Sequence, residues 1–177
     1  MDKVMSNEFL ERATEWVKGN FFEDFAPDQK FDHHWGRTIN EGDNSLFTTL
    51  TLNFNPLYFN REYAKENGHK GIQVNPLLVF NTVLGLSVED LSEAGGPFVG
   101  IENLSYGVPV YPGDTLTASS ITLDARLSES KKGFGIVSWR TEGSNQKGAT
   151  VITFERANLV MTTAYAQQVK VAMEMQS

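Results

Sequence analysis

The feature that most constrains the fold is one strongly apolar segment followed by a series of strand-like segments. The apolar segment, Val74–Leu86, has large aliphatic side chains around most of the circumference of a helix. Such a pattern predicts a helix that is buried on most sides. Pro76 suits its first turn, because the amide that proline lacks would be unpaired there. The aliphatic positions are Leu77, Leu78, Val79, Val83, Leu84 and Leu86.

The second half of the chain has the composition of a β-sheet. Segments rich in β-branched and aromatic residues alternate with turns that contain glycine, proline or lysine. A fifth strand is expected before the apolar helix, at Phe31–Ile39, where residues alternate in type. The four later strands are predicted at about Phe98–Tyr106, Leu116–Leu127, Gly135–Glu142 and Ala149–Met161.

Shorter helices are predicted around this core. Asn7–Val17 has apolar residues at helical spacing. Asp43 or Asn44 is a candidate N-cap for a helix that runs to Leu52, and Phe59–Asn67 is a second short helix. The tail, Thr162–Ser177, is weakly amphipathic, and we expect it to be either a helix or disordered.

One long helix with a strand before it and four after it predicts an α+β fold, an antiparallel sheet wrapped around a helix. A length of 177 residues suits one domain. We expect an N-terminal helix and linker at 1–30, the domain proper at 31–161, and a C-terminal tail at 162–177.

Composition narrows the possible partners. The net charge of −7 and the absence of a Lys/Arg stripe argue against a nucleic-acid partner. There is no cysteine, hence no disulfide and no thiol nucleophile. No apolar run reaches the ~18–20 residues that span a bilayer, and Met1–Asn20 lacks the apolar core of a signal peptide. We therefore expect a cytoplasmic protein without a membrane partner.

Three motifs carry a family resemblance: N-F-N-P-L-Y-F-N at Asn53–Asn60, G-I-Q-V-N-P at Gly71–Pro76, and V-P-V-Y-P-G-D-T-L at Val108–Leu116. Together they resemble the signature of MaoC-like (R)-specific enoyl-CoA hydratases, roughly D-x-N-P-x-H-x-D followed by V-H-G before an apolar helix. The resemblance covers roughly 31–161 and implies the hotdog fold. It is nearest to the mesaconyl-CoA and methylmalyl-CoA hydratase branch, which carries T-x-N-x-x-P-L-x-F.

The resemblance implies hydration of an enoyl thioester or the reverse dehydration, with no cofactor and no metal. The family's Asp and His positions are occupied by Asn53 and Tyr58, which become the candidate catalytic residues. Asn cannot accept a proton near neutral pH, and tyrosine, with a pKa near ~10, is a poor base but a hydrogen-bond donor. The family's oxyanion amide at the helix start is absent, because Pro76 has no N–H. The candidate substrate-binding residues are Asn55, Asn75, Pro76 and Leu77.

Other titratable residues could replace the missing acid and base. His34, His69 and Glu62 are candidates for a compensating acid or base. His33 and His34 cannot easily chelate one metal ion together, because adjacent strand residues face opposite sides, so we expect a structural or surface role for them.

Two alternatives remain open from the sequence. The chain is either a hydratase or dehydratase for the acyl thioester of CoA or a carrier protein, or a non-catalytic acyl-binding subunit that partners an intact hydratase chain. A hotdog thioesterase is disfavoured, because Asn81 and Thr82 stand mid-helix where a carboxylate is needed. The exposed sheet edge predicts a homodimer or higher homo-oligomer, with a heteromer as the other arrangement.

Overall fold

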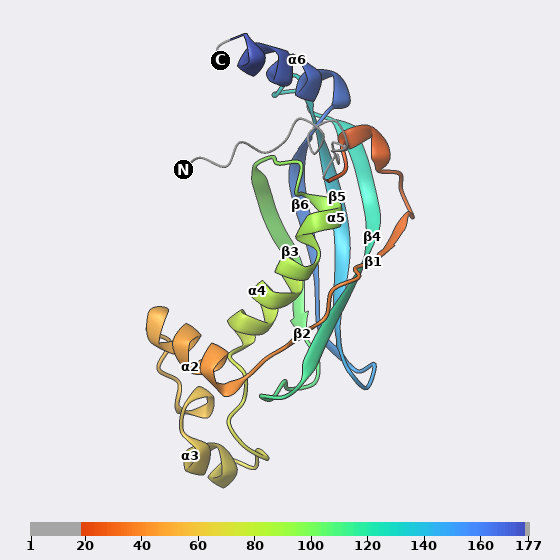
Figure 1. The fold of residues 1–177 in the computed structure, drawn as a ribbon. Helices are drawn as coiled ribbons and strands as arrows, with labels where there is room; N and C mark the ends of the chain where they lie inside the picture. The colour runs from red at the N-terminus through yellow and green to blue at the C-terminus, as the bar shows by residue number, and fades with distance from the viewer. Residues whose placement is uncertain (1–18, 176–177) are drawn as a thin grey trace, which may run out of the picture.

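The computed structural model describes residues 19–175 and contains one antiparallel sheet with a helix lying along it (Figure 1). The sheet has six strands in the order β1-β4-β5-β6-β3, with β2 also paired to β4. The predicted α+β hotdog architecture is confirmed. The strands are β1 (Lys30–Asp32), β2 (Arg37–Thr38), β3 (Phe98–Tyr106), β4 (Thr115–Leu127), β5 (Phe134–Asn145) and β6 (Thr150–Met161). The helices are η1 (Phe22–Asp24), α2 (Glu41–Leu50), η2 (Pro56–Tyr58), α3 (Arg61–Glu66), α4 (Pro76–Leu86), α5 (Val88–Leu91) and α6 (Thr163–Glu174).

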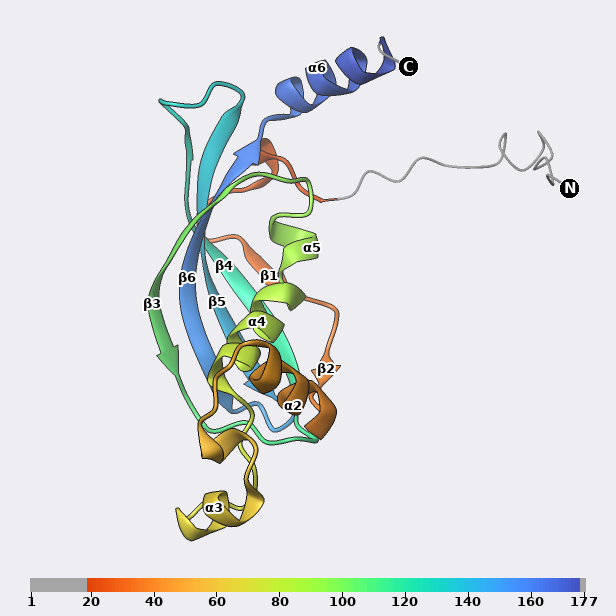
Figure 2. The ribbon, with the colours of Figure 1, turned by 90° about the vertical axis from the view of Figure 1, so that its left-hand side faces the viewer.

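The helix α4 lies against one face of the curved sheet, as Figure 2 shows. Val79 and Val83 are buried between the helix and the strands, and the ring of Phe80 meets that of Phe154 edge-on at 5.1 Å. Gly143 of β5 is required at this contact, because a Cβ there would lie 2.5 Å from Val83 Cγ2. The core therefore sits between α4 and the middle strands.

The expectation that α4 is buried on most sides is wrong for the single chain. Leu77 is 46% exposed, and only Val79 and Val83 of the helix are fully buried. The sheet covers one side of the helix, and no described element covers the other completely. Apolar residues on that side are therefore partly exposed in the single chain.

The expected strand at Phe31–Ile39 is interrupted. Both β1 and β2 pair with β4, but four residues of the N-terminal segment, His33–Gly36, face only Thr117 and Ala118. The side chain of His33 turns into the core, and its backbone amide still donates to the carbonyl oxygen of Ala118 at 3.1 Å. Its Nδ1 lies 2.6 Å from Asp90 Oδ2 and its Nε2 lies 2.9 Å from Ser120 Oγ.

The helix caps differ from expectation. The N-cap of α2 is Asn40, which forms a capping box with Asp43. Neither Asp43 nor Asn44 is the N-cap, and Asn44 is 1% exposed inside the fold. The helix also ends at Leu50 rather than Leu52, which has a left-handed backbone with φ 55°. The predicted helix at Phe59–Asn67 is confirmed as the shorter α3, with Asn60 as its N-cap.

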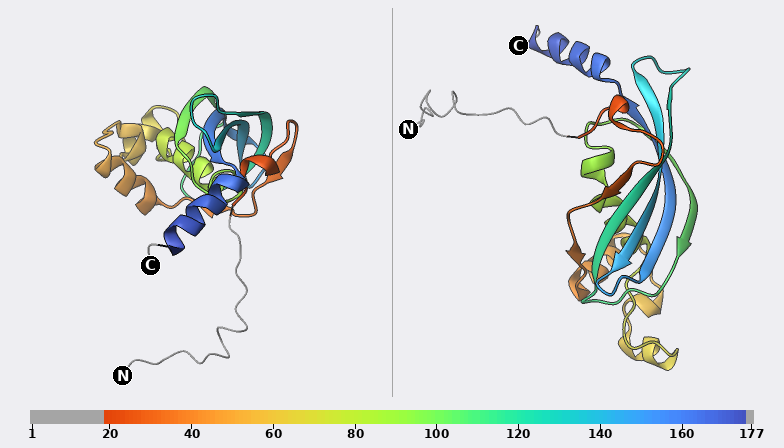
Figure 3. Two further views of the ribbon diagram at one scale, coloured as in Figure 1. Left: turned by 90° about the horizontal axis from the view of Figure 1, so that it is seen from above. Right: turned by 90° about the vertical axis from the view of Figure 1, so that its right-hand side faces the viewer.

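The strand β3 forms one edge of the sheet, and Figure 3 shows it beside β6. Its pairing with β6 shifts register between Glu102 and Ser105, and Asn103 within this bulge has φ 51°. Most β3 side chains are exposed. This edge is open to further pairing.

Described residues on both sides of the predicted domain, 31–161, are also part of the structure. Phe25 is buried against Trp139, with ring centroids 5.1 Å apart, so residues before 31 also contribute to the core. The tail forms α6, capped by Thr162. The predicted helix at Asn7–Val17 lies outside the described residues, and the division 1–30, 31–161 and 162–177 stays a prediction. Across residues 19–175, every helix is too short or too polar to cross a membrane.

Candidate active site

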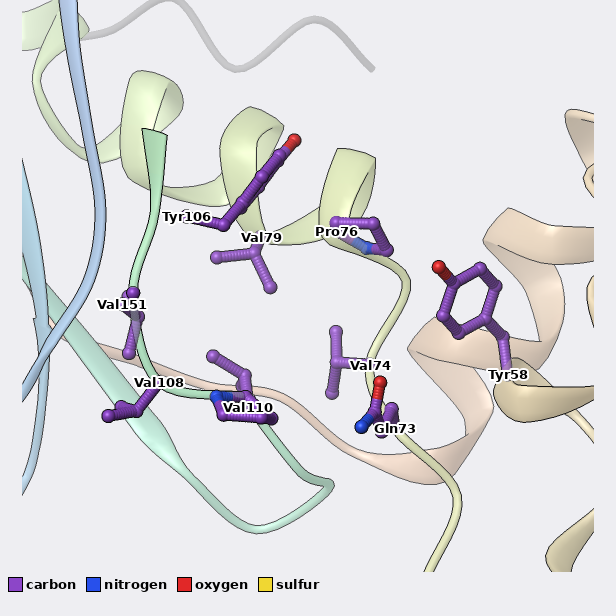
Figure 4. Close-up of a pocket in the computed structure, with 11 residues that line it drawn as sticks. Tyr58, Gln73, Val74, Pro76, Val79, Tyr106, Val108, Val110 and Val151 are labelled. Carbon is purple, nitrogen blue, oxygen red and sulfur yellow. The ribbon is translucent and has the colours of Figure 1, made fainter. Parts of the chain in front are cut away.

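A cavity of about 280 Å³ opens at the N-terminal end of α4 (Figure 4). Its wall is largely apolar, and the polar groups on it are the side chains of Tyr58, Gln73 and Tyr106. In Figure 4 the Tyr58 hydroxyl points toward Pro76, which begins the helix. An apolar cavity with a few polar groups is the usual form of a small-molecule site. The valines of the wall are Val74, Val79, Val108, Val110 and Val151.

One buried side chain, Asn44, holds the segments on either side of this cavity. Its Nδ2 donates to the carbonyl oxygens of Tyr58 and Gln73, both at 2.9 Å. Its Oδ1 accepts the backbone amide of Asn75 at 2.7 Å. A single amide therefore fixes η2 relative to the start of α4.

The start of α4 offers no unpaired backbone amide. Pro76 has none, and the amide of Leu77 donates to Asn75 Oδ1 at 3.0 Å. The amides of Leu78 and Val79 both donate to the carbonyl oxygen of Asn75. The helix therefore cannot supply the N–H that usually makes a helix N-terminus an anion site.

The two tyrosines on the wall are protonated donors near neutral pH. Burial raises the pKa of Tyr58 above its usual value. Burial also raises the pKa of Tyr106, and the nearby Tyr58 hydroxyl raises it further. Two hydroxyls that stay neutral can both donate hydrogen bonds to an oxygen that becomes negative.

The structure brings two of the six predicted site residues to the cavity, Tyr58 and Pro76. The other four lie outside its lining. Asn53 is partly buried in the loop after α2, where its backbone N–H donates to the carbonyl oxygen of Thr48 at 3.2 Å. Asn55 caps η2 through a 3.1 Å bond to the Leu57 amide, and Leu77 faces outward.

Asn75 is the most constrained of these four residues. It is fully buried and caps α4. Its Nδ2 group has no hydrogen-bond partner within the described structure. The side-chain NH₂ group of Asn75 is therefore an unpaired hydrogen-bond donor between Val74 and Pro76, which both line the cavity.

Of the three compensating candidates, only His69 reaches the site. Its Nδ1 lies 2.6 Å from Nε2 of Gln73, which is on the cavity wall. Glu62 is exposed and pairs with Lys65. His34 is exposed beside Glu89, 3.7 Å away, and does not line the cavity.

Sequence reasoning missed Gln73, Tyr106 and Asn44. Gln73 stands within the quoted G-I-Q-V-N-P motif, so its position beside the helix start was a usable signal. Tyr106 ends a strand far along the chain, and nothing in its local sequence indicates the cavity. Within residues 19–175, no group of three or more His, Cys, Asp or Glu side chains is placed to hold a metal ion.

Comparison with known proteins identifies the family. The model of the mesaconyl-CoA hydratase family matches residues 1–169. The chain belongs to this family. A mesaconyl-CoA hydratase from Haloarcula hispanica is 35% identical over 152 residues, which are 85% of this chain and 42% of the relative. The chain thus spans about two fifths of the length of this curated relative.

Solved structures agree with this family assignment. A MaoC domain protein dehydratase from Chloroflexus aurantiacus has 32% identity and a TM-score of 0.80, over 85% of this chain and 43% of that one. A Mycobacterium tuberculosis protein with a double hotdog fold has 21% identity and a TM-score of 0.76, over 82% of this chain and 45% of that one. The second match supports the fold alone.

Proposed function

We propose that this chain binds an enoyl-CoA thioester in the cavity at the start of α4 and takes part in the reversible hydration of its double bond. The observation that carries the proposal is the pair of tyrosine hydroxyls, Tyr58 and Tyr106, on an otherwise apolar wall beside the helix. The names of the family and of its relatives point to the same class of reaction.

The reaction sets three requirements. A base removes a proton from water as its oxygen bonds to C3, an acid delivers a proton to C2, and donors hold the thioester oxygen while it carries negative charge. No redox step is involved, and we propose that the reaction proceeds without a cofactor.

The tyrosines fit the third requirement. Because the amides at the start of α4 are absent or already paired, the helix has no donor left for the thioester oxygen. Tyr58 and Tyr106 stay protonated and face the same cavity. We propose that they replace the backbone amide as donors to that oxygen.

The first two requirements are not met within this cavity. None of its lining residues is Asp, Glu, His, Lys or Arg. The relative from Haloarcula is more than twice as long, since this chain covers 42% of it. We propose that a second hotdog unit, from another copy or another chain, completes the site. Of the other predicted site residues, Asn55 and Asn75 support the cavity only indirectly, as the caps of η2 and α4, and Asn53 and Leu77 have no proposed contact with the acyl group in this cavity.

Substitution of the tyrosines tests the donor role. Tyr58→Phe and Tyr106→Phe should each lower kcat for hydration of crotonyl-CoA or mesaconyl-CoA by about 10²–10³-fold, as expected for loss of one oxyanion donor. Tyr63→Phe is the matched control, because Tyr63 is exposed on α3 and does not line the cavity. Full activity of both cavity variants would reject the donor role.

A second candidate is a non-catalytic acyl-binding unit. The lack of an acid or base on the cavity wall favours it. Under this reading the purified chain binds crotonyl-CoA without hydrating it, and Tyr58→Phe weakens that binding. Turnover by the purified chain alone would exclude this candidate. A thioesterase gains no support, because α4 contains no Asp or Glu.

The second unit is tested by self-association. The open edge of β3 and the outward apolar side of α4 are the surfaces that another unit would cover. We expect at least a dimer in analytical ultracentrifugation at micromolar concentration. A monomer would direct the search to a different chain as the partner.

A further inference from the structure

Gln73 differs from the other polar residues on the cavity wall because its side chain contains a carbonyl oxygen. Tyr58 and Tyr106 carry hydroxyl groups, and the remaining lining residues, within residues 19–175, are valine, proline or glycine. A hydroxyl group can both donate and accept, whereas a carbonyl oxygen only accepts. The Gln73 oxygen is therefore the one side-chain atom on this wall that acts as an acceptor alone.

The backbone of Gln73 is held on both sides of its side chain. Its N–H donates to the carbonyl oxygen of Leu57 at 3.0 Å, and its own carbonyl oxygen accepts from Asn44 Nδ2 at 2.9 Å. The next amide, that of Val74, donates to the Val110 carbonyl at 2.9 Å. The point from which the side chain leaves is therefore fixed relative to η2 and to the segment before β4.

The far end of the Gln73 side chain contacts His69. Nε2 of Gln73 lies 2.6 Å from Nδ1 of His69 and 3.3 Å from the other ring nitrogen, so Nδ1 is the partner. His69 is placed by α3, because its backbone N–H donates to the carbonyl oxygen of the buried Ala64 at 3.0 Å. The Gln73 amide group therefore has a defined partner that does not itself line the cavity.

This contact decides which end of the Gln73 amide faces the cavity. A ring nitrogen without a hydrogen can only accept, and the NH₂ group is the donor of a side-chain amide. When Nδ1 of His69 accepts from Nε2, the carbonyl oxygen is left for the cavity. In Figure 4 the side-chain oxygen of Gln73 points toward the side on which Tyr58 and Pro76 lie, and the nitrogen points the other way. A hydrogen on Nδ1 would reverse the amide and turn the NH₂ group to the cavity.

We propose that the Gln73 carbonyl oxygen holds the water molecule that adds to the double bond, and that His69 is the positioning residue that keeps this oxygen turned to the cavity. This inference rests on the proposed function and assigns the place of its water. The water oxygen bonds to C3 while the electrons of the C2–C3 double bond move toward C2 and the thioester oxygen. One water proton passes to the base of the second unit, and an acid returns a proton to C2. The other water proton, which Gln73 binds, stays on the new hydroxyl group.

The polar groups on the wall suit the two oxygen atoms of this reaction. The thioester oxygen becomes negative and requires donors, which are the hydroxyls of Tyr58 and Tyr106. The water must direct a lone pair at C3, so its hydrogens must point elsewhere, and the Gln73 oxygen fixes one of them. The same acceptor would bind the C3 hydroxyl group of the product.

Substitution of His69 tests the positioning role. His69→Ala removes the partner of Gln73 and should lower kcat for crotonyl-CoA about tenfold with little change in KM, as expected for the loss of one orienting hydrogen bond. His69→Asn should restore most of kcat, because Asn Oδ1 is bonded to Cγ, as Nδ1 is in histidine, and accepts a hydrogen bond. His34→Ala is the matched control, because His34 is exposed and does not line the cavity. Full activity of His69→Ala, or a kcat in His69→Asn as low as in His69→Ala, would overturn the positioning role.

Binding measurements separate this inference from the proposed reaction. In calorimetric titration, 3-hydroxybutyryl-CoA should bind the wild type about tenfold more tightly than butyryl-CoA, which has no hydroxyl group at C3. Gln73→Leu removes the acceptor at a similar volume and should abolish this difference, which would support the water site even if the purified chain hydrates nothing. Equal Kd values for the two thioesters in the wild type, or the same difference in Gln73→Leu, would overturn the water site and leave the reaction standing. Failure of both thioesters to bind would refute the proposed function and this inference with it.

Discussion

The side chain of Asn44 accepts the backbone amide of Asn75 at 2.7 Å and so ties α2 to the start of α4. The same side chain donates to the carbonyls of Tyr58 and Gln73. Both of those residues line the cavity. The shape of the candidate site therefore depends on one amide that itself never touches the ligand space.

Replacing Asn44 should destabilise the protein and loosen the cavity together. Asn44→Ala removes three buried hydrogen bonds and should lower the free energy of unfolding by about 3 kcal/mol. Asn81→Ala is the control, because the exposed Asn81 makes one bond to the Leu77 carbonyl, and its effect should stay within about 0.5 kcal/mol. Urea denaturation measures both values. Equal effects would contradict the linking role of Asn44.

The tyrosines give a prediction for alkaline pH. Burial raises the pKa of Tyr58 and Tyr106 in the folded state. At a pH between about 10 and these raised pKa values, the unfolded chain therefore binds fewer protons than the folded chain. The contribution of the two protonated tyrosines to the stability of the folded state is fully present below pH ~10, and it is lost as the pH rises through their folded pKa values. The free energy of unfolding should therefore fall above pH ~10, and less steeply in Tyr58→Phe. An identical slope in the variant would contradict this assignment.

Pro76→Gly should create the missing donor at the helix start. The new amide would stand at the cavity wall, where the following three amides are already paired within the protein. One added donor should stabilise the transition state of hydration by about 1–3 kcal/mol. The start of the helix would also become less rigid, because glycine has more backbone freedom than proline. The measurement is kcat/KM for crotonyl-CoA. A folded variant with unchanged kcat/KM would place the oxyanion site elsewhere.

The double variant Asn53→Asp, Tyr58→His tests whether proton transfer can be restored at these two positions. Asn53 lies outside the cavity lining, and Tyr58 is the proposed donor to the thioester oxygen. The double variant should therefore lower crotonyl-CoA hydration by about 10²–10³-fold, as Tyr58→Phe does. A rise of about 10²-fold or more, the effect of an added general acid or base, would show instead that position 53 reaches the substrate.

The sequence predicts the large elements well because their signals are local. The strands β3 to β6 follow runs of β-branched and aromatic residues, and α4 follows an apolar run opened by Pro76. The break between β1 and β2 is not local, because it lies in the pairing with the distant strand β4, where four residues face only two. No pattern within Phe31–Ile39 contains that partner.

The candidate site is less accessible to sequence reasoning. Tyr58 and Pro76 can be predicted from the sequence, because both stand in motifs that lie close to the cavity. Tyr106 and Gln73 enter it through tertiary packing, and the position of Asn53 outside the lining depends on how the loop after α2 folds. The sequence predicts a helix cap at Asn44, because an Asn near a helix start commonly caps it. Its burial is set by carbonyls that lie 14 and 29 residues away.

The bonds of His33 also set an order of events during synthesis on the ribosome. Its partners Asp90 and Ser120 follow it by 57 and 87 residues, so the imidazole has neither partner when it first emerges. The helix α4 likewise emerges before β4, β5 and β6, which cover it. The apolar side chains of α4 are therefore exposed to water until the strands that cover them have been synthesised. Apolar surface that is exposed in this way favours aggregation, so a chaperone would protect the nascent chain most at this stage.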